Sequence, residues 1–173
     1  MPQYTIQEYA NLLTRTYAPR FPRDDRPRTV TDVTERGEEI LEFILPNPVE
    51  GRFSVSLQVR TYKEFVSECS LFFGQAEVAG RLEPEEAISA MDVVLGDGIV
   101  AIVRYKNREA YDNHRKAGSG RAEWLFQMPD DAAELEEMLT KLKKPASLME
   151  KISGKMTGVF EVYRWSGSEV LER

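Results

Sequence analysis

Cysteine and histidine are almost missing from this sequence, since each occurs once, as Cys69 and His114. A single cysteine cannot form a disulfide within the chain, so the fold has to rest on its own hydrophobic core. Zinc sites built from several cysteine and histidine ligands are excluded for the same reason. Nothing in the sequence resembles Asp-x-Asp, His-Glu-x-x-His or a calcium-binding loop either. We expect neither a metal site nor a bound cofactor.

Long hydrophobic runs are lacking as well. No stretch approaches the roughly 20 apolar residues that a membrane-spanning helix needs. The opening residues, MPQYTIQEYANLL, have neither the basic start nor the continuous apolar segment of a secretory signal. A lone thiol also fits a reducing compartment. We expect a cytoplasmic protein that has no membrane partner.

Positive charge is in the minority. The 173 residues include 23 basic and 29 acidic side chains, so the net charge is −6. A nucleic acid would be repelled at long range by such a protein, and we expect no nucleic-acid partner. The length and the 42% of hydrophobic residues fit one soluble globular domain, residues 1–173.

The spacing of apolar residues predicts the order of helices and strands. A helix is expected over residues 1–18, because Thr5 and Glu8 form a capping box and Pro19 follows. Residues 19–38 are rich in arginine and proline and predict an extended connector. In the main body, 39–173, helices are predicted at 84–95 and after Pro129, and strands at 40–45, 53–59, 99–105, 124–128 and 159–165.

Residues 61–74 fit two patterns. Thr61 and Glu64 would cap a helix, whereas the Val- and Phe-rich sequence that follows suits a strand paired with 53–59. We favour the strand. The whole pattern then predicts an α+β fold: a single domain with a mostly antiparallel sheet of about five to six strands and helices mainly on one face.

The strand at 53–59 has a polar face made by Ser54, Ser56 and Gln58. This face lacks the charges that usually discourage edge-to-edge pairing. If the strand lies at an edge of the sheet, it can pair with a second copy and form a twofold homodimer.

A glycine motif at 96–101, GDGIVA, loosely matches a dinucleotide-binding fingerprint. That fingerprint needs a strand before the loop and a helix after it, which is the reverse of the predicted order. We interpret Gly96 as the left-handed residue that ends a helix, followed by a turn at Asp97 and Gly98.

The segment 104–121 is predicted as a basic loop with six basic and two acidic residues, on a chain that is acidic overall. It would hold an anion or an acidic patch of a partner, although ordinary solvated charge remains an alternative. The candidate binding residues are Arg104, Lys106, His114, Arg115, Lys116, Gly118, Gly120 and Arg121.

Two catalytic interpretations of this loop are open. Residues 115–120 match the Arg-x-x-Gly-x-Gly loop by which acetyl-CoA-dependent N-acetyltransferases hold pyrophosphate, although a strand rather than a helix is predicted next. His114, between Asp112 and Arg115, would serve as a general base. No serine or cysteine nucleophile is marked by a local motif, and the apolar surroundings of Cys69 predict an inert thiol. We assign no catalytic residue.

The runs SLFFGQAEVAG, LEPEEAISAMDVVLGDGIVAIVRYKN and AGSGRAEWL, within residues 66–128, resemble a layout found in small bacterial immunity-type proteins. These proteins neutralise toxins of contact-dependent systems. The resemblance implies a non-catalytic, acidic, partner-binding domain.

The sequence therefore favours a non-catalytic binding protein over an enzyme. An immunity-type inhibitor or an accessory protein of a bacterial system is the function we expect, with a protein or a second copy of the chain as the partner. The alternatives are a small CoA-dependent N-acyltransferase that uses the 115–120 loop and a self-associating domain of unknown ligand.

Overall fold

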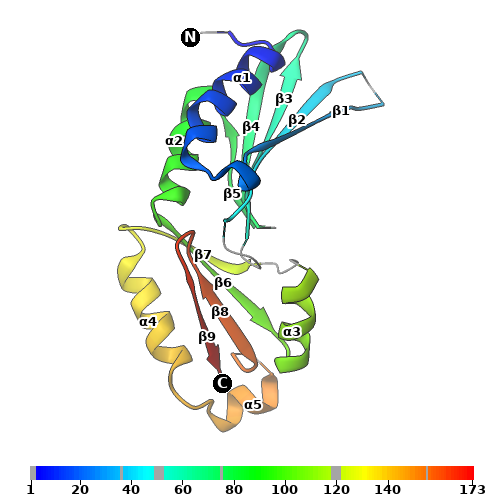
Figure 1. Cartoon of the computed structure of the whole chain (residues 1–173). Helices are drawn as coiled ribbons and strands as arrows, with labels where there is room; N and C mark the ends of the chain where they lie inside the picture. Colours follow the sequence, from blue (N-terminus) through cyan, green and yellow to red (C-terminus); the bar gives the residue numbers. More distant parts are fainter. Residues whose placement is uncertain (1–2, 36, 49–52, 75, 118–121, 155) are drawn as a thin grey trace. The chain divides into compact units, whose positions relative to one another are not determined.

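The computed structural model describes residues 3–35, 37–48, 53–74, 76–117, 122–154 and 156–173 (Figure 1). The chain divides into two compact units, residues 1–92 and 93–173. Each unit contains an antiparallel sheet, with five strands in the first and four in the second. The predicted α+β class with antiparallel strands is confirmed, and its strands are shared between two sheets.

The first unit is a sheet in the order β1-β2-β3-β4-β5, with α1 and α2 on one face (Figure 1). Short 3₁₀ turns at Ala18–Arg20 and Arg23–Asp25 follow α1. The elements are α1 (Ile6–Tyr17), β1 (Arg28–Val33), β2 (Glu39–Leu45), β3 (Val55–Tyr62), β4 (Phe65–Phe73), β5 (Ala76–Leu82) and α2 (Pro84–Leu95), which runs past Asp92 into the second unit.

The helix α1 begins as the sequence predicts. The Glu8 amide donates to the Thr5 hydroxyl, and the Thr5 amide donates to the Glu8 carboxylate at 2.9 Å. Tyr9, Leu13 and Tyr17 recur on one side of the helix and are fully buried. The helix therefore covers the sheet through an apolar stripe at helical spacing.

Two tyrosine hydroxyls of α1 donate hydrogen bonds to backbone carbonyls of α2. The Tyr9 hydroxyl donates to the Pro84 carbonyl at 2.7 Å, and the Tyr17 hydroxyl donates to the Ile88 carbonyl at 3.1 Å. A hydroxyl inside the fold needs such a partner, because its desolvation would otherwise be uncompensated. The two helices consequently form one layer over the sheet.

Three sequence expectations for this unit need correction. The connector 19–38 contains a strand, β1, because Arg28–Val33 pairs with β2 over its whole length. A further strand, β5, follows β4. The predicted strand at 53–59 belongs to β3, which lies between β2 and β4. The proposed homodimer through this strand is wrong, since both of its edges are already paired.

The favoured strand interpretation of residues 61–74 is confirmed. β3 ends at Tyr62, and β4 begins at Phe65 and pairs back along β3. Buried Val55, Leu57 and Val59 alternate with half-buried polar side chains, so the period of two decides the structure here.

The second unit has the strand order β7-β6-β8-β9. Its strand β6 lies between β7 and β8, and six of its seven residues are buried. The elements are β6 (Ile99–Tyr105), α3 (Arg108–Ala117), β7 (Ala122–Gln127), α4 (Ala132–Leu142), α5 (Leu148–Ser153), β8 (Val159–Tyr163) and β9 (Ser168–Glu172).

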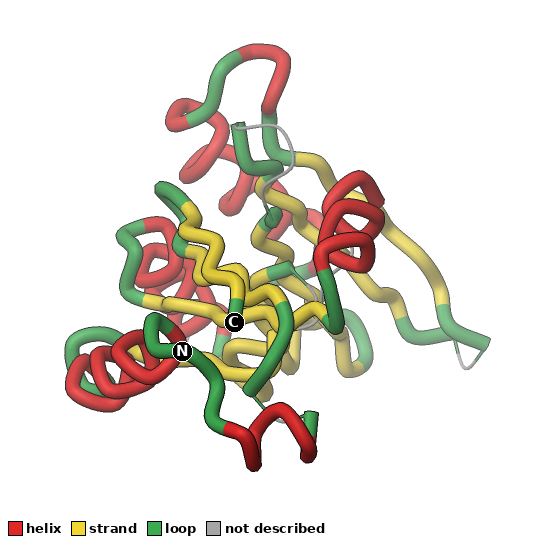
Figure 2. The backbone as a smooth tube through the Cα atoms, turned by 90° about the horizontal axis from the view of Figure 1, so that it is seen from below, coloured by secondary structure: helices red, strands yellow, loops and turns green. Residues whose placement is uncertain are grey.

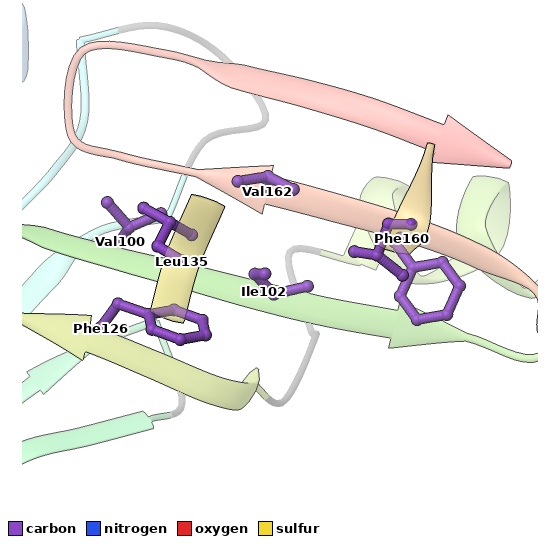
Figure 3. Packing of buried hydrophobic residues seen from close by; sticks show 7 residues of the cluster. Val100, Ile102, Phe126, Leu135, Phe160 and Val162 are labelled. Atoms are coloured by element: carbon purple, nitrogen blue, oxygen red, sulfur yellow. The ribbon is translucent and has the colours of Figure 1, made fainter. Parts of the chain in front are cut away.

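The core of the second unit lies between α4 and one face of this sheet. Leu135 and Leu142 of α4 are buried against side chains of β6, β7 and β8 (Figure 3). The sheet contributes Val100, Ile102, Phe126, Phe160 and Val162. The helix α3 packs on the opposite face of the sheet. Its Tyr111 ring lies edge-on to the Tyr105 ring, with 5.2 Å between the ring centroids.

The structure corrects the expectations for the second unit in three places. Residues 108–117 form the helix α3, although the segment 104–121 was predicted to be a loop. The left-handed residue after α2 is Asp97, with φ 61°, and not Gly96. Its amide donates to the Val94 carbonyl, and the Gly98 amide donates to the Val93 carbonyl, so Asp97 ends the helix in a Schellman motif. α5 and β9 were not predicted.

Within the described ranges, no helix is both long enough and apolar enough to cross a membrane.

Cys69 provides a test of the first core. The side chain is fully buried in β4, and its thiol lies 3.9 Å from the Tyr9 hydroxyl. Burial raises the pKa of the thiol to about 12. We expect a thiol reagent to label the native protein at least about a hundredfold more slowly than the denatured protein, because the reactive thiolate forms only after opening.

The same shift predicts a pH dependence. An unfolded cysteine titrates at about 8.5, so this thiol makes its full contribution to the free energy of unfolding below that pH. Between that pH and the folded pKa of about 12, the thiol ionises in the unfolded chain but not in the folded one, and the contribution is lost. Rapid labelling of the native protein at pH 7, measured by mass spectrometry, would contradict the buried placement.

Candidate functional site

The helix α5 is short but strongly capped. The Glu150 amide donates to the Ser147 hydroxyl at 3.3 Å, and the Ser147 amide donates to the Glu150 carboxylate at 2.8 Å. Gly154 ends the helix in the left-handed conformation, with φ 66°. Both ends of this six-residue helix are thus specified by side-chain and backbone chemistry.

Arg173 fixes the position of α5 through several hydrogen bonds. Its guanidinium donates to the Lys144 carbonyl at 2.8 Å, to the Met156 carbonyl at 3.1 Å and to the Glu150 carboxylate at 2.8 Å. The arginine side chain is 4% exposed. It therefore joins the segments before, within and after α5 through one planar group.

Arg104 supports the far end of the same segment. Its guanidinium donates to the Thr157 carbonyl at 3.0 Å and also to the Gly154 carbonyl. Arg104 lies on β6, so the loop after α5 is fixed to the central strand of the sheet. The sequence analysis named Arg104 as a binding residue, whereas its described contacts are structural.

The helix that these two arginines fix in place exposes three apolar side chains to solvent. Leu148 and Met149 are each 73% exposed, and Ile152 is 72% exposed. Leu148 and Ile152 are one helical turn apart and lie on the same side of α5. A single exposed leucine is ordinary on a protein surface, but three large apolar side chains exposed on one six-residue helix form an apolar patch.

The segment that contains the patch is rich in lysine. Residues 141–151 include four lysines and one glutamate. That glutamate, Glu150, is engaged by Arg173, and Lys143 is paired with Glu169 at 3.6 Å. Lys144 and Lys151 are exposed. We call Leu148, Met149, Ile152, Lys144 and Lys151 the α5 surface.

The pKa of Glu150 is lowered from its ordinary value. The hydrogen bonds from the Ser147 amide and hydroxyl are the main causes, and Arg173 adds to them. The carboxylate therefore stays ionised around neutral pH, where it caps the helix and balances the buried guanidinium.

Four of the remaining predicted binding residues lie in α3 or in the turn before it. Lys106 is exposed in the turn between β6 and α3, and His114 is exposed on α3, where its ring packs against Tyr105 at 5.9 Å. Arg115 and Lys116 are on the last turns of α3, and their side chains lie outside the described part. Gly118, Gly120 and Arg121 lie outside the described residues altogether.

His114 is close to a buried polar group that the sequence analysis did not single out. Glu161 on β8 is 1% exposed and accepts a hydrogen bond from the Tyr105 hydroxyl at 3.3 Å. Tyr163 lies on the same face, and burial raises its pKa, with further contributions from Tyr105 and Glu161. This carboxylate is enclosed by the fold, so a solute cannot reach it in this conformation.

No family model, no curated protein and no solved structure matches this chain. A metal-binding group of three or more histidine, cysteine or acidic side chains is also missing from the part of the chain that the structure describes.

The α5 surface is a candidate site that the sequence analysis missed. A signal for the helix was present, because Ser147 and Glu150 have the capping-box spacing directly after Pro145. The sequence pattern did not predict that the apolar residues of this helix are exposed, since Leu148 and Ile152 at helical spacing ordinarily indicate a buried face.

Removal of the Arg173 guanidinium tests the support of α5. In Arg173→Ala, we expect hydrogen exchange of the amides of Leu148–Ser153 to accelerate by at least about tenfold, because three acceptors lose a charged donor. Arg173→Lys restores little of the protection, since an ammonium cannot reproduce the planar fork. The exposed Arg164 serves as a control, and equal exchange in Arg164→Ala and Arg173→Ala would contradict this role.

The acyltransferase alternative has its own test. Arg115 and Lys116 are near the C-terminal end of α3, and the next described element is the strand β7. A pyrophosphate loop needs a helix N-terminus after it. We expect acetyl-CoA at millimolar concentration to leave the melting temperature unchanged, whereas a ligand bound at about 100 times its Kd adds about 2.7 kcal/mol. A shift that Gly118→Asp abolishes would contradict this expectation.

Proposed function

We propose that this chain is a non-catalytic binding protein that recognises an acidic protein partner through the α5 surface. One observation carries the proposal: Leu148, Met149 and Ile152 are each more than 70% exposed on a helix that is capped at both ends. Exposed apolar side chains on rigid elements are the usual anchors of protein interfaces.

The rigidity of α5 supports a role in recognition. A mobile apolar segment loses conformational entropy when it binds, which reduces affinity. In α5, the hydrogen bonds from Arg104 and Arg173 provide this ordering before a partner arrives. The apolar side chains are therefore presented in a fixed arrangement, although they remain exposed to water.

The charges around α5 favour an acidic partner surface. Lys144 and Lys151 are close to the apolar residues in sequence and are exposed, whereas the carboxylate of Glu150 forms an ion pair with Arg173. A partner that offers an apolar pocket with acidic residues at its rim would complement both features. An anionic membrane fits less well, because the chain as a whole has a net charge of −6 and would be repelled by it.

The resemblance to immunity-type proteins gives this proposal a more specific form. In that form, the partner is a bacterial toxin and binding blocks its action. The cytoplasmic location proposed from the sequence agrees with such an inhibitor. The α5 surface adds a requirement on the toxin, which must offer an acidic patch around the apolar contact.

Two charges placed in the patch test the proposal. In Leu148→Asp/Ile152→Asp, we expect affinity for the partner to fall by at least about a hundredfold, because each aspartate would lose its hydration in an apolar pocket and face an acidic rim. The partner is purified from cells of the source organism with the wild-type chain, and its Kd is then measured by calorimetry.

Tyr62→Asp is the matched control, because Tyr62 is 70% exposed but belongs to the first unit. It should bind as the wild type does. Affinity should also decrease as salt is added, since the lysines attract the partner. Retention of the partner by the double variant, or binding of the wild type to anionic vesicles in its place, would overturn the proposal.

A further inference from the structure

The strand β1 is an open edge of the first sheet. All six of its residues are exposed, and Val30 and Val33 are 52% and 61% exposed. The β1–β2 hairpin projects from the rest of its unit in both views (Figures 1 and 2). An open edge of β-branched residues is a template for another strand.

The opposite edge of the same sheet is protected. Pairing between β4 and β5 is interrupted by register shifts at Cys69–Leu71 and at Leu71–Phe72. Arg81 on β5 adopts a left-handed backbone conformation, with φ 58°. Such irregularities prevent regular pairing with an added strand. β1 has no comparable protection along Arg28–Val33.

The direction of the free backbone groups on β1 follows from its turn. The Thr34 amide points toward β2, since it donates to the Glu38 carbonyl at 2.9 Å. The Val33 amide instead donates to the carboxylate of its neighbour Asp32 at 2.8 Å. Because successive amides of a strand point in opposite directions, those of Thr29, Thr31 and Val33 point away from β2.

This alternation restricts how two copies of β1 can pair. In an antiparallel pair, residues that face each other must both point their backbone groups inward or both outward. With a twofold axis at Val30, Thr29 faces the partner subunit's Thr31, and both residues have outward backbone groups. A shift by one residue would break this match along the entire strand.

The side chains of β1 are self-complementary in the same register. Arg28 faces the partner subunit's Asp32, Asp32 faces the partner subunit's Arg28, and Val30 faces the partner subunit's Val30. Opposite charges, threonine pairs and β-branched pairs are the cross-strand combinations that stabilise antiparallel sheets. A shift by two residues in either direction would place Arg28 or Asp32 opposite the partner subunit's Val30 and leave Arg28 without its acidic partner.

We propose that two copies of this chain form a homodimer by antiparallel pairing of β1 with β1, centred on Val30. A continuous sheet then runs through both subunits, and the interface is isologous. The contact is small compared with standard protein interfaces, so we expect a dissociation constant of about 1–100 μM. The dimer contact uses residues of the first unit, whereas α5 belongs to the second.

Thr31→Pro separates the dimer from the fold. The Thr31 amide points away from β2, so proline removes hydrogen bonds of the dimer and none of those between β1 and β2. We expect its dimer dissociation constant to rise by at least about tenfold in sedimentation equilibrium. Thr31→Ala is the matched control, which keeps the amide and should remain within about threefold of the wild type.

A mixing experiment tests the register. Arg28→Glu and Asp32→Lys should each weaken the dimer by about tenfold, since each brings two like-charged pairs together. An equimolar mixture of the two variants should recover the wild-type association. In the mixed dimer, the introduced glutamate faces the introduced lysine, and the remaining Asp32 faces the remaining Arg28. Recovery also shows that both variants are folded.

The outcomes separate this inference from its alternatives. A wild-type chain that stays monomeric at about 500 μM, well above the expected dissociation constant, a Thr31→Pro variant that associates as the wild type does, or a mixture that remains monomeric would each overturn the proposal. Loss of association in Thr31→Pro together with recovery in the mixture supports it. None of these results depends on the partner of the α5 surface, which the Leu148→Asp/Ile152→Asp variant tests separately.

Discussion

The buried guanidinium of Arg173 is the contact on which the position of α5, and with it the proposed binding surface, depends. It is 4% exposed and reaches Lys144, Glu150 and Met156, which lie before, within and after α5. A charged group in such a place is stable only because its donors are satisfied and a carboxylate lies opposite. The same contacts hold α5 in place while Leu148, Met149 and Ile152 remain exposed, so the position of this helix does not depend on burial of these three side chains.

The two units use their exposed apolar residues in different ways. In the first unit, α1 and α2 cover one face of the sheet, and tyrosine hydroxyls join the helices. Val30 and Val33, which are both exposed, are on β1, an edge strand that pairs with β2 alone. Among the described residues of the second unit, the apolar side chains with the largest exposed fractions, Leu148, Met149 and Ile152, are on α5, a helix that is capped at both ends. An edge strand suits pairing with another strand, whereas a capped helix suits insertion of side chains into a pocket.

Much of the fold could be predicted from local sequence. The capping box at Thr5 and the alternation along Val55–Val59 have strong local signals, and both elements appear as expected. β1 could not be predicted in this way, because Arg28 follows a segment of arginine and proline and its residues bury no face. α3 was missed because its polar sequence contains a single large apolar anchor, Tyr111, and its helical conformation depends on packing against Tyr105.

The sequence by itself determined the class of the fold, the positions of the strongly patterned elements and the net charge, since these depend on composition and on spacing within a few residues. The tertiary structure decided which strands are central and which are edges, and it moved β3 from a supposed edge to the middle of a sheet. It also decided the roles of Arg104 and Arg173, which are 69 residues apart in sequence and hold the same segment. Contacts between residues so far apart in sequence depend on the path of the whole chain, so local sequence patterns do not predict them.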